Sequence, residues 1–322
     1  MSNIKNEQTI PSIQELAFEL EKSVSEVFIG DKDRISLSVI GLLGSLHILI
    51  EDIPGVGKTT LALALSQAAG MSFSRIQFTP DMLPGDVLGM NIWDPLLRDF
   101  VFRQGPIEVN TVLADELNRT SPRTQSAFLE AMQEAQVTID GKTRSLPKPF
   151  FLIATQNPSH FAGTFPLPEA ELDRFGLSFS LGYPSVDDEA EILRRKSLPN
   201  SQTKARVVAS PSTILEAQLS VSNIHVSELI RNYIVSIIRA TRNSADIRLG
   251  ASPRAGLFLQ QASRARAATQ GRDFTIPEDV EFLAPAVLAH RVQLSSQARL
   301  AQLDSAKCIR TLCGKIPKPT GL

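Results

Sequence analysis

The amino-acid sequence predicts an α/β fold in which a domain with a parallel five-stranded sheet is followed by an all-α domain. Short apolar runs alternate with helical patterns as far as residue 183, and only helical patterns follow. The chain of 322 residues is long enough for two domains of ordinary size. We therefore predict an α/β domain over residues 1–183 and a helical domain over residues 184–322.

Five short apolar runs have the length and the flanking residues of buried parallel strands. They occupy residues 47–50, 74–78, 111–114, 150–155 and 177–181. Helical patterns at residues 11–27 and 31–43 precede the first run. Before the fourth run, residues 137–146 alternate around an Asp-Gly pair, which predicts a β-hairpin on the surface. The pair Phe100 and Phe102 is expected in the core.

Three helices are predicted in the second domain. Residues 227–242 carry an apolar stripe at helical spacing, made of Leu229, Ile230, Tyr233, Ile234, Ile237 and Ile238. Residues 253–268 and 277–289 each begin with a proline, which is favoured in the first turn of a helix.

Composition and charge exclude several classes of protein. Hydrophobic residues make up 43% of the chain and charged residues 21%, which is typical of a folded globular protein. The net charge of −1 gives no overall attraction to nucleic acid, and none is expected as a partner. Neither a secretory signal nor an apolar stretch of about 20 residues is apparent, so we expect a cytoplasmic protein without a membrane span. Cys308 and Cys313 are spaced for neither a zinc site nor a redox pair.

The first predicted strand leads into a glycine-rich loop and then a helical pattern. The loop reads Pro54-Gly55-Val56-Gly57-Lys58-Thr59-Thr60. In a phosphate-binding loop, main-chain N–H groups face the phosphates, the lysine reaches the β and γ oxygens, and the threonine binds Mg²⁺. Asp52 stands where the first glycine of the GxxxxGK[ST] pattern belongs. A glycine-rich turn with a solvated lysine is the alternative, but the strand–loop–helix context favours the phosphate loop.

Polar side chains also follow two later strands. Asp115 and Glu116 end the third run, and Asn157 follows the fourth. Because the carboxyl ends of parallel strands meet at one edge of a sheet, these groups are expected near the loop. Asp115 would hold Mg²⁺ through water, Glu116 would polarise the attacking water, and Asn157 could orient that water. Taken singly, each could be a solvated turn residue.

Two arginines lie at predicted helix ends. Ser252-Pro253-Arg254 places Arg254 in a first turn, where a cation opposes the helix dipole unless an anion such as a phosphate is bound. We expect ATP to close the helical domain through Arg254. Arg174 lies in the last turn of a short helical pattern, where a cation is favourable without any ligand. A simple helix-terminal charge is therefore an open alternative for Arg174.

These motifs together resemble the MoxR family of AAA+ ATPases. The resemblance covers about residues 27–292 and is carried by residues 48–59, 75–81, 112–119, 125–134, 154–157 and 165–175. It implies a P-loop AAA+ core with a helical lid. The roles it implies are Lys58 and Thr59 as Walker A, Asp115 and Glu116 as Walker B, Asn157 as sensor 1, Arg174 as an arginine finger offered to a neighbouring subunit, Arg254 as sensor 2, and Ile29 and Gly30 as part of the adenine pocket.

The resemblance also implies a function. A member of this family would hydrolyse ATP with Mg²⁺ as a ring, expected to be a hexamer, and would mature or activate a partner complex together with a von Willebrand factor A-domain protein. A magnesium-chelatase-like motor subunit and a nucleotide-gated switch with little hydrolysis are the alternatives. A small-molecule kinase would not need an arginine facing a neighbour. GTP is disfavoured because no Asn-Lys-x-Asp segment is present.

Overall fold

The computed structural model describes residues 12–156, 164–197 and 204–320. Up to the last strand of the main sheet, the elements are α1 (Ile13–Ser25), α2 (Lys32–Leu43), β1 (Ile48–Glu51), α3 (Lys58–Ala68), β2 (Phe73–Gln77), α4 (Pro84–Leu88), β3 (Gly89–Asp94), β4 (Asp99–Gln104), β5 (Thr111–Asp115), η1 (Leu117–Arg119), α5 (Pro122–Glu134), β6 (Gln136–Ile139), β7 (Lys142–Ser145), β8 (Phe151–Gln156), α6 (Glu169–Leu172) and β9 (Leu177–Phe179). Helices dominate the rest of the chain, with α7 (Val186–Lys196), α8 (Pro211–Ser222), α9 (Glu228–Asn243), β10 (Ile247–Leu249), α10 (Pro253–Thr269), α11 (Pro277–Leu288), η2 (Ala289–Arg291), β11 (Gln293–Leu294), α12 (Ser296–Leu300) and α13 (Ser305–Lys315).

The five predicted strands form one parallel sheet in the order β2-β5-β8-β1-β9. Alternate residues of a strand point to opposite faces, so each strand supplies two apolar layers. Ile48 and Ile50 belong to the layer shared with α1, α2, α3 and the helical domain, whereas Leu49 belongs to the layer shared with α5. Burial on both faces explains why these strands read as continuous apolar runs rather than as alternating ones.

The predicted helices are present with their expected end signals. Ser12 caps α1 in a reciprocal pair with Glu15, and Ser252 caps α10 with Pro253 in its first turn. The apolar stripe of α9 is buried except at Leu229, which is 43% exposed. The short strands β10 and β11 pair within the helical domain, where the sequence predicted helices alone. In the described part of the chain, no helix is long and apolar enough to cross a membrane.

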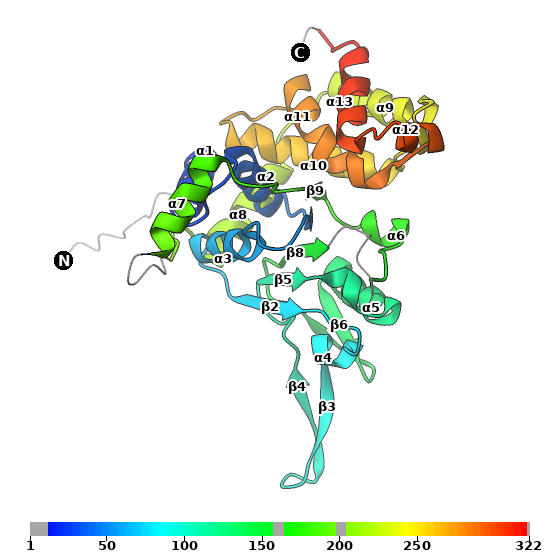
Figure 1. Ribbon diagram of the computed structural model, residues 1–322. Helices are drawn as coiled ribbons and strands as arrows, with labels where there is room; N and C mark the ends of the chain where they lie inside the picture. The colour runs from blue at the N-terminus through cyan, green and yellow to red at the C-terminus, as the bar shows by residue number, and fades with distance from the viewer. Residues whose placement is uncertain (1–11, 157–163, 198–203, 321–322) are drawn as a thin grey trace, which may run out of the picture.

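Two β-hairpins extend from the α/β domain. The β6–β7 hairpin turns at Asp140 and Gly141 as predicted, and both residues have positive φ. The β3–β4 hairpin was not predicted, and Figure 1 shows it projecting away from the rest of the molecule. The expectation that Phe100 and Phe102 lie in the core is wrong. Phe100 is 64% exposed and packs edge-on against Trp93, and Phe102 is half-buried beneath the guanidinium of Arg144.

Candidate functional site

The glycine-rich loop joins the carboxyl end of β1 to the start of α3. Gly55 and Gly57 have φ values of 91° and 92°, in the left-handed region that favours glycine. No side chain caps α3, so its first turn has main-chain N–H groups to offer to an anion. A cavity of about 490 Å³ is lined by loop residues, among them Gly55, Gly57 and Thr59, and by the apolar residues Val27, Phe28 and Ile29. A polar loop together with apolar residues suits a phosphate-bearing ligand with an aromatic base.

A second, smaller cavity adjoins the first. It has a volume of about 290 Å³ and is lined by Ile29, Gly30, Val56 and Tyr183, among others. The structure therefore brings Ile29 and Gly30 next to the loop, and their role in an adenine pocket, which the family resemblance implies, stays a prediction. Space around Gly30 is limited, because a Cβ there would lie 2.9 Å from the Phe28 ring.

Lys58 lies folded over the loop that carries it. Its Nζ donates hydrogen bonds to the carbonyl oxygens of Asp52 at 2.7 Å and Ile53 at 3.2 Å. Burial lowers the pKa of Lys58, and the negative charges of Asp52, Asp115 and Glu116 oppose that shift. An ammonium held against the loop by two carbonyl oxygens can exchange these bonds for bonds to the oxygens of a phosphate.

The structure gives a reason for the unusual Asp52. Its Oδ2 accepts hydrogen bonds from the main-chain N–H groups of Leu181 at 2.7 Å and Gly182 at 2.8 Å, and from the Ser180 hydroxyl at 3.0 Å. The buried carboxylate thus ties the start of the loop to the segment that leads from β9 towards the helical domain. A glycine at position 52 could not make this connection. The sequence pattern marked Asp52 as a departure but gave no sign of these distant partners.

Asp115 ends β5 beside the loop, as predicted, with both carboxylate oxygens engaged. Thr155 donates to Oδ1 at 2.6 Å, and Arg75 donates to Oδ2 at 2.6 and 3.1 Å. Sequence reasoning gave neither partner a role. Among the described residues, Oδ1 accepts only the bond from Thr155 and can accept one more, so water can still bridge Asp115 to a cation. With the hydroxyl of Thr59, this makes a set of hard oxygen ligands that fits Mg²⁺.

Glu116 has a backbone conformation that is rare outside glycine. Its φ of 56° and ψ of 46° lie in the left-handed region, where strain often marks a functional position. Its Oε2 accepts hydrogen bonds from Arg119 at 2.8 Å and from Gln77 at 2.9 Å. Arg75 and Gln77 of β2 therefore reach the two neighbouring acids of β5. Asn157 falls outside the described residues.

Arg174 lies at the amino ends of the sheet strands, whereas the loop lies at their carboxyl ends. The main-chain N–H of Gly176 bonds to the carbonyl of His47, just before β1, whereas the loop follows the end of β1. The Arg174 guanidinium pairs with Glu171 at 2.8 Å and donates to the carbonyl of Leu129 at 3.1 Å. Arg174 therefore cannot serve the loop of its own chain in this arrangement.

Arg254 lies on the same side as Arg174. Ser252, at the start of α10, donates a hydrogen bond to Asp173 Oδ2 at 3.2 Å, and the Arg254 guanidinium lies 5.6 Å from the centre of the Phe258 ring. The expected closure of the helical domain through Arg254 when ATP binds stays a prediction. The contact between Ser252 and Asp173 joins residues 79 positions apart, which no local pattern encodes.

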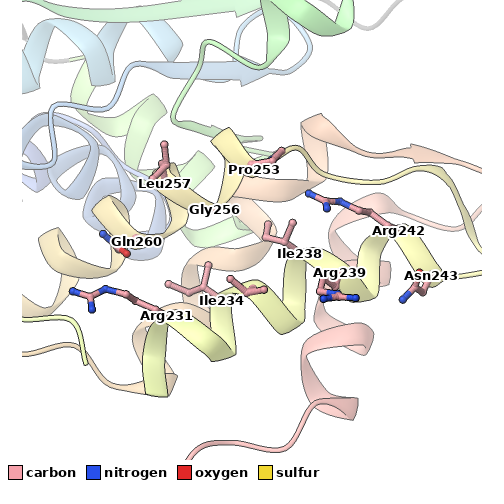
Figure 2. A pocket seen from close by; sticks show the side chains of 11 residues that line it. Arg231, Ile234, Ile238, Arg239, Arg242, Asn243, Pro253, Gly256, Leu257 and Gln260 are labelled. Atoms are coloured by element: carbon pink, nitrogen blue, oxygen red, sulfur yellow. The ribbon is translucent and has the colours of Figure 1, made fainter. Parts of the chain in front are cut away.

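A further groove of about 620 Å³ lies within the helical domain, between α9 and α10 (Figure 2). Its lining combines the apolar side chains of Ile234, Ile238 and Leu257 with arginines such as Arg231 and Arg239. None of the predicted site residues lines it, so the groove is separate from the loop cavity.

Comparison with known proteins identifies the family. The family model described as "ATPase family associated with various cellular activities (AAA)" matches residues 47–177, and the AAA lid domain model matches residues 239–310. A Bacillus subtilis protein named YeaC and described as uncharacterized is 44% identical over 298 residues, 92% of each chain. Chaperone MoxR1 of Mycobacterium tuberculosis is 39% identical over 312 residues, which cover 93% of this chain and 82% of the relative. A solved structure from Cytophaga hutchinsonii has a TM-score of 0.88 at 35% identity and covers 96% of both chains.

A five-stranded parallel sheet with a glycine-rich loop after β1 and a helical domain behind it defines the class, together with the two family models. The protein is an AAA+ ATPase with an α/β core and a helical lid. Within that class, the chain belongs to the MoxR family, as its identity to Chaperone MoxR1 over almost the whole chain shows.

Proposed function

We propose that this ATPase works as a homo-oligomeric ring, with six subunits expected, and that each ATP site is completed by residues of the neighbouring subunit. One observation carries the proposal. The loop cavity lies at the carboxyl ends of the sheet strands, and Arg174 and Arg254 lie on the side of their amino ends. Charge develops on the transferring phosphoryl group, and an arginine from a second subunit is a known way to stabilise it. A ring places one subunit's arginines beside the next subunit's loop.

Within one subunit, we propose the roles that the family resemblance implies. Lys58 binds the β and γ phosphate oxygens, while Thr59 and Asp115 hold Mg²⁺, which neutralises charge on the phosphates when bound. Glu116 polarises the attacking water. To do so, its carboxylate has to exchange its bonds with Arg119 and Gln77 for the water. Asn157 is proposed to orient the same water, and Ile29 and Gly30 to line the adenine pocket.

We further propose that ATP turnover drives the remodelling of a partner protein complex. The β3–β4 hairpin supports this, because it projects from the body and exposes Trp93, Leu96, Leu97 and Phe100 to solvent. Exposed apolar clusters of this kind usually mark contacts with other proteins. Cytoplasmic location, a partner with a von Willebrand factor A domain, and a domain boundary at residues 183/184 complete the proposal.

The experiment uses Glu116→Gln protein, which should bind ATP and retain it. The tagged variant is expressed in its native cells, purified with ATP and Mg²⁺, weighed by native mass spectrometry, and its co-purifying proteins are identified. The proposal predicts a closed oligomer, expected at six subunits, that carries a partner with a von Willebrand factor A domain. A monomer with ATP bound at every concentration would contradict the ring. A ring that carries no partner would contradict the remodelling role.

A further inference from the structure

A polar cluster, in which Arg291 is buried and Asp173 is partly exposed, joins the segment that carries Arg174 to the helical domain. Asp173 lies at its centre and uses both carboxylate oxygens. Oδ1 accepts a hydrogen bond from Arg291 Nε at 2.8 Å, and Oδ2 accepts one from the Ser252 hydroxyl at 3.2 Å. Arg291 follows α11 and Ser252 precedes α10, so one side chain of the α/β domain binds two elements of the helical domain.

Arg291 holds the main chain of the same turn. Its side chain is only 1% exposed and donates to the carbonyl oxygens of Asp173 at 3.3 Å, Gly176 at 3.3 Å, and Phe175. Arg174 lies inside this turn. The planar guanidinium fixes several acceptors at once, which a lysine at this position could not do. The turn therefore cannot move relative to α11 without breaking several buried bonds.

The second arginine is fixed to the same cluster. The guanidinium groups of Arg291 and Arg254 both lie over the ring of Phe258, at 4.6 and 5.6 Å from its centre. The pKa of Arg291 is lowered to about 10 by burial, the nearby positive charge of Arg254 also lowers it, and the bond to Asp173 opposes the shift. Two cations held this close to each other repel, and Asp173 compensates for part of that repulsion.

Stability alone does not account for the cluster. Burying an ion pair costs desolvation energy, and apolar residues of similar size often give equal stability. What such a cluster gives is a fixed geometry. Here the geometry that it fixes is the relative position of Arg174, on the α/β domain, and Arg254, on the helical domain.

We propose that Asp173 and Arg291 are positioning residues that lock Arg174 and Arg254 into a single face, which the subunit offers to its neighbour's ATP. This inference rests on the proposed function, because it needs a site shared between subunits. Its consequence is that the two arginines reach the neighbour's phosphates together. A movement of the helical domain in one subunit would then change the rate of hydrolysis in the next.

The test mixes two kinds of subunit so that only one kind of site can work. Arg174→Ala subunits keep their ATP site, and Glu116→Gln subunits keep their arginines. Asp173→Asn is then added either to the Glu116→Gln subunit or to the Arg174→Ala subunit. In the first case, the turnover number should fall by about tenfold or more, since small misplacements of catalytic groups are costly, with KM for ATP little changed. In the second case, it should fall by less than about twofold.

A matched control is Asp279→Asn. Asp279 is a carboxylate that likewise pairs with arginines, Arg272 at 2.6 Å and Arg266 at 3.3 Å, but it is more deeply buried than Asp173 and lies within the helical domain alone. Asp279→Asn should change the turnover number of the mixture equally, whichever of the two subunits carries it. If Asp173→Asn subunits do not fold, Arg291→Lys, which keeps the charge and loses the fork of donors, replaces it in the same design.

The possible outcomes distinguish the positioning role of Asp173 from the shared ATP site on which it rests. No rescue in the parent mixture, with subunit exchange verified by mass, would contradict the shared site itself. Asp173→Asn could instead lower the rescue equally in either subunit, or in neither. Both results would agree with a shared site and would contradict the positioning role of Asp173.

Discussion

The main-chain N–H of Gly176 donates a hydrogen bond to the carbonyl of His47 over 2.9 Å. His47 precedes β1 and the phosphate loop follows it, so the whole of β1 separates this contact from the loop. A strand of four residues is about 13 Å long at roughly 3.3 Å per residue. Arg174 precedes Gly176 by two residues, so it lies at the amino ends of the strands, away from the loop. This relationship supports the proposal that the ATP site of one chain is completed by a second chain.

Lys58→Ala and Glu116→Gln should separate binding from hydrolysis. Lys58→Ala removes the ammonium that faces the phosphates, so ATP binding should be lost. Glu116→Gln keeps that ammonium and loses only the carboxylate that polarises water, so ATP should bind and persist. Titration with a fluorescent ATP analogue and a phosphate-release assay measure the two effects. Wild-type hydrolysis by Glu116→Gln would contradict the role given to Glu116.

Asp52→Ala should affect stability more than ATP binding. The substitution removes the acceptor of the Leu181 N–H and one of the two acceptors of the Gly182 N–H, which also bonds to the Ser180 hydroxyl. An unpaired buried group costs about 1–3 kcal/mol, and these partly buried groups should cost less. Lys58 bonds to the carbonyl oxygen of Asp52, which the substitution keeps. Thermal unfolding should therefore occur at a clearly lower temperature, while ATP affinity should fall far less than in Lys58→Ala. Asp52→Asn, which retains one oxygen, should lie between wild type and Asp52→Ala in stability.

Arg254→Ala subunits should be rescued by Glu116→Gln subunits. If Arg254 serves the neighbour, an Arg254→Ala subunit keeps a competent ATP site that a Glu116→Gln neighbour can complete. If Arg254 serves its own chain, both kinds of subunit lack a working site and the mixture stays inactive. The ATPase rate against mixing ratio distinguishes the two. Arg239→Ala, in the groove between α9 and α10, is the control and should behave as wild type.

Acid should loosen the segment around Arg174. The ring of His290 contacts this segment through a hydrogen bond to the carbonyl of Phe175, whereas His47 contacts it through its main-chain carbonyl and its ring accepts from Leu152 N–H. Burial lowers the pKa of His47 to about 4 and that of His290 well below its usual value. Both rings are neutral in the folded protein, whereas the unfolded chain takes up protons below about pH 6.5. The free energy of unfolding should therefore fall as the pH drops from about 6.5 towards 4.

Urea titrations at several pH values measure this dependence. His47→Gln is the control, because an amide can accept the hydrogen bond that Leu152 N–H donates to His47 Nδ1. The variant should lose less stability than wild type between pH 6.5 and 4. Equal losses in the two proteins would show that His47 is not part of the acid response.

The parts of this fold that could be predicted are those in which a buried element has a recognisable pattern of apolar residues in its own sequence. The main strands are covered on both faces, and their apolar runs reveal them. The β3–β4 hairpin was missed because its side chains, such as Phe100, face solvent, so the link between apolar character and burial fails there. The phosphate loop was predictable because its residues are contiguous.

Contacts between distant residues could not be predicted. The bonds of Asp52 to residues 180–182 and of Asp173 to Ser252 and Arg291 span between 79 and 130 positions. Nothing in the helical pattern near Arg254 tells which edge of the sheet the helix will meet. The sequence therefore indicated that Arg254 has a role, but only the folded chain shows its side of the molecule.

The shared site is tested most directly by mixing Arg174→Ala subunits with Glu116→Gln subunits. Each variant alone should bind ATP and hydrolyse almost none of it, since an arginine finger contributes about 10³–10⁵ in rate. The measurement is the ATPase rate against mixing ratio, with exchange of subunits verified by mass. We predict a maximum at intermediate ratios, where Arg174→Ala sites are completed by the Arg174 of their neighbours. Verified exchange without any gain in rate would contradict a site shared between subunits.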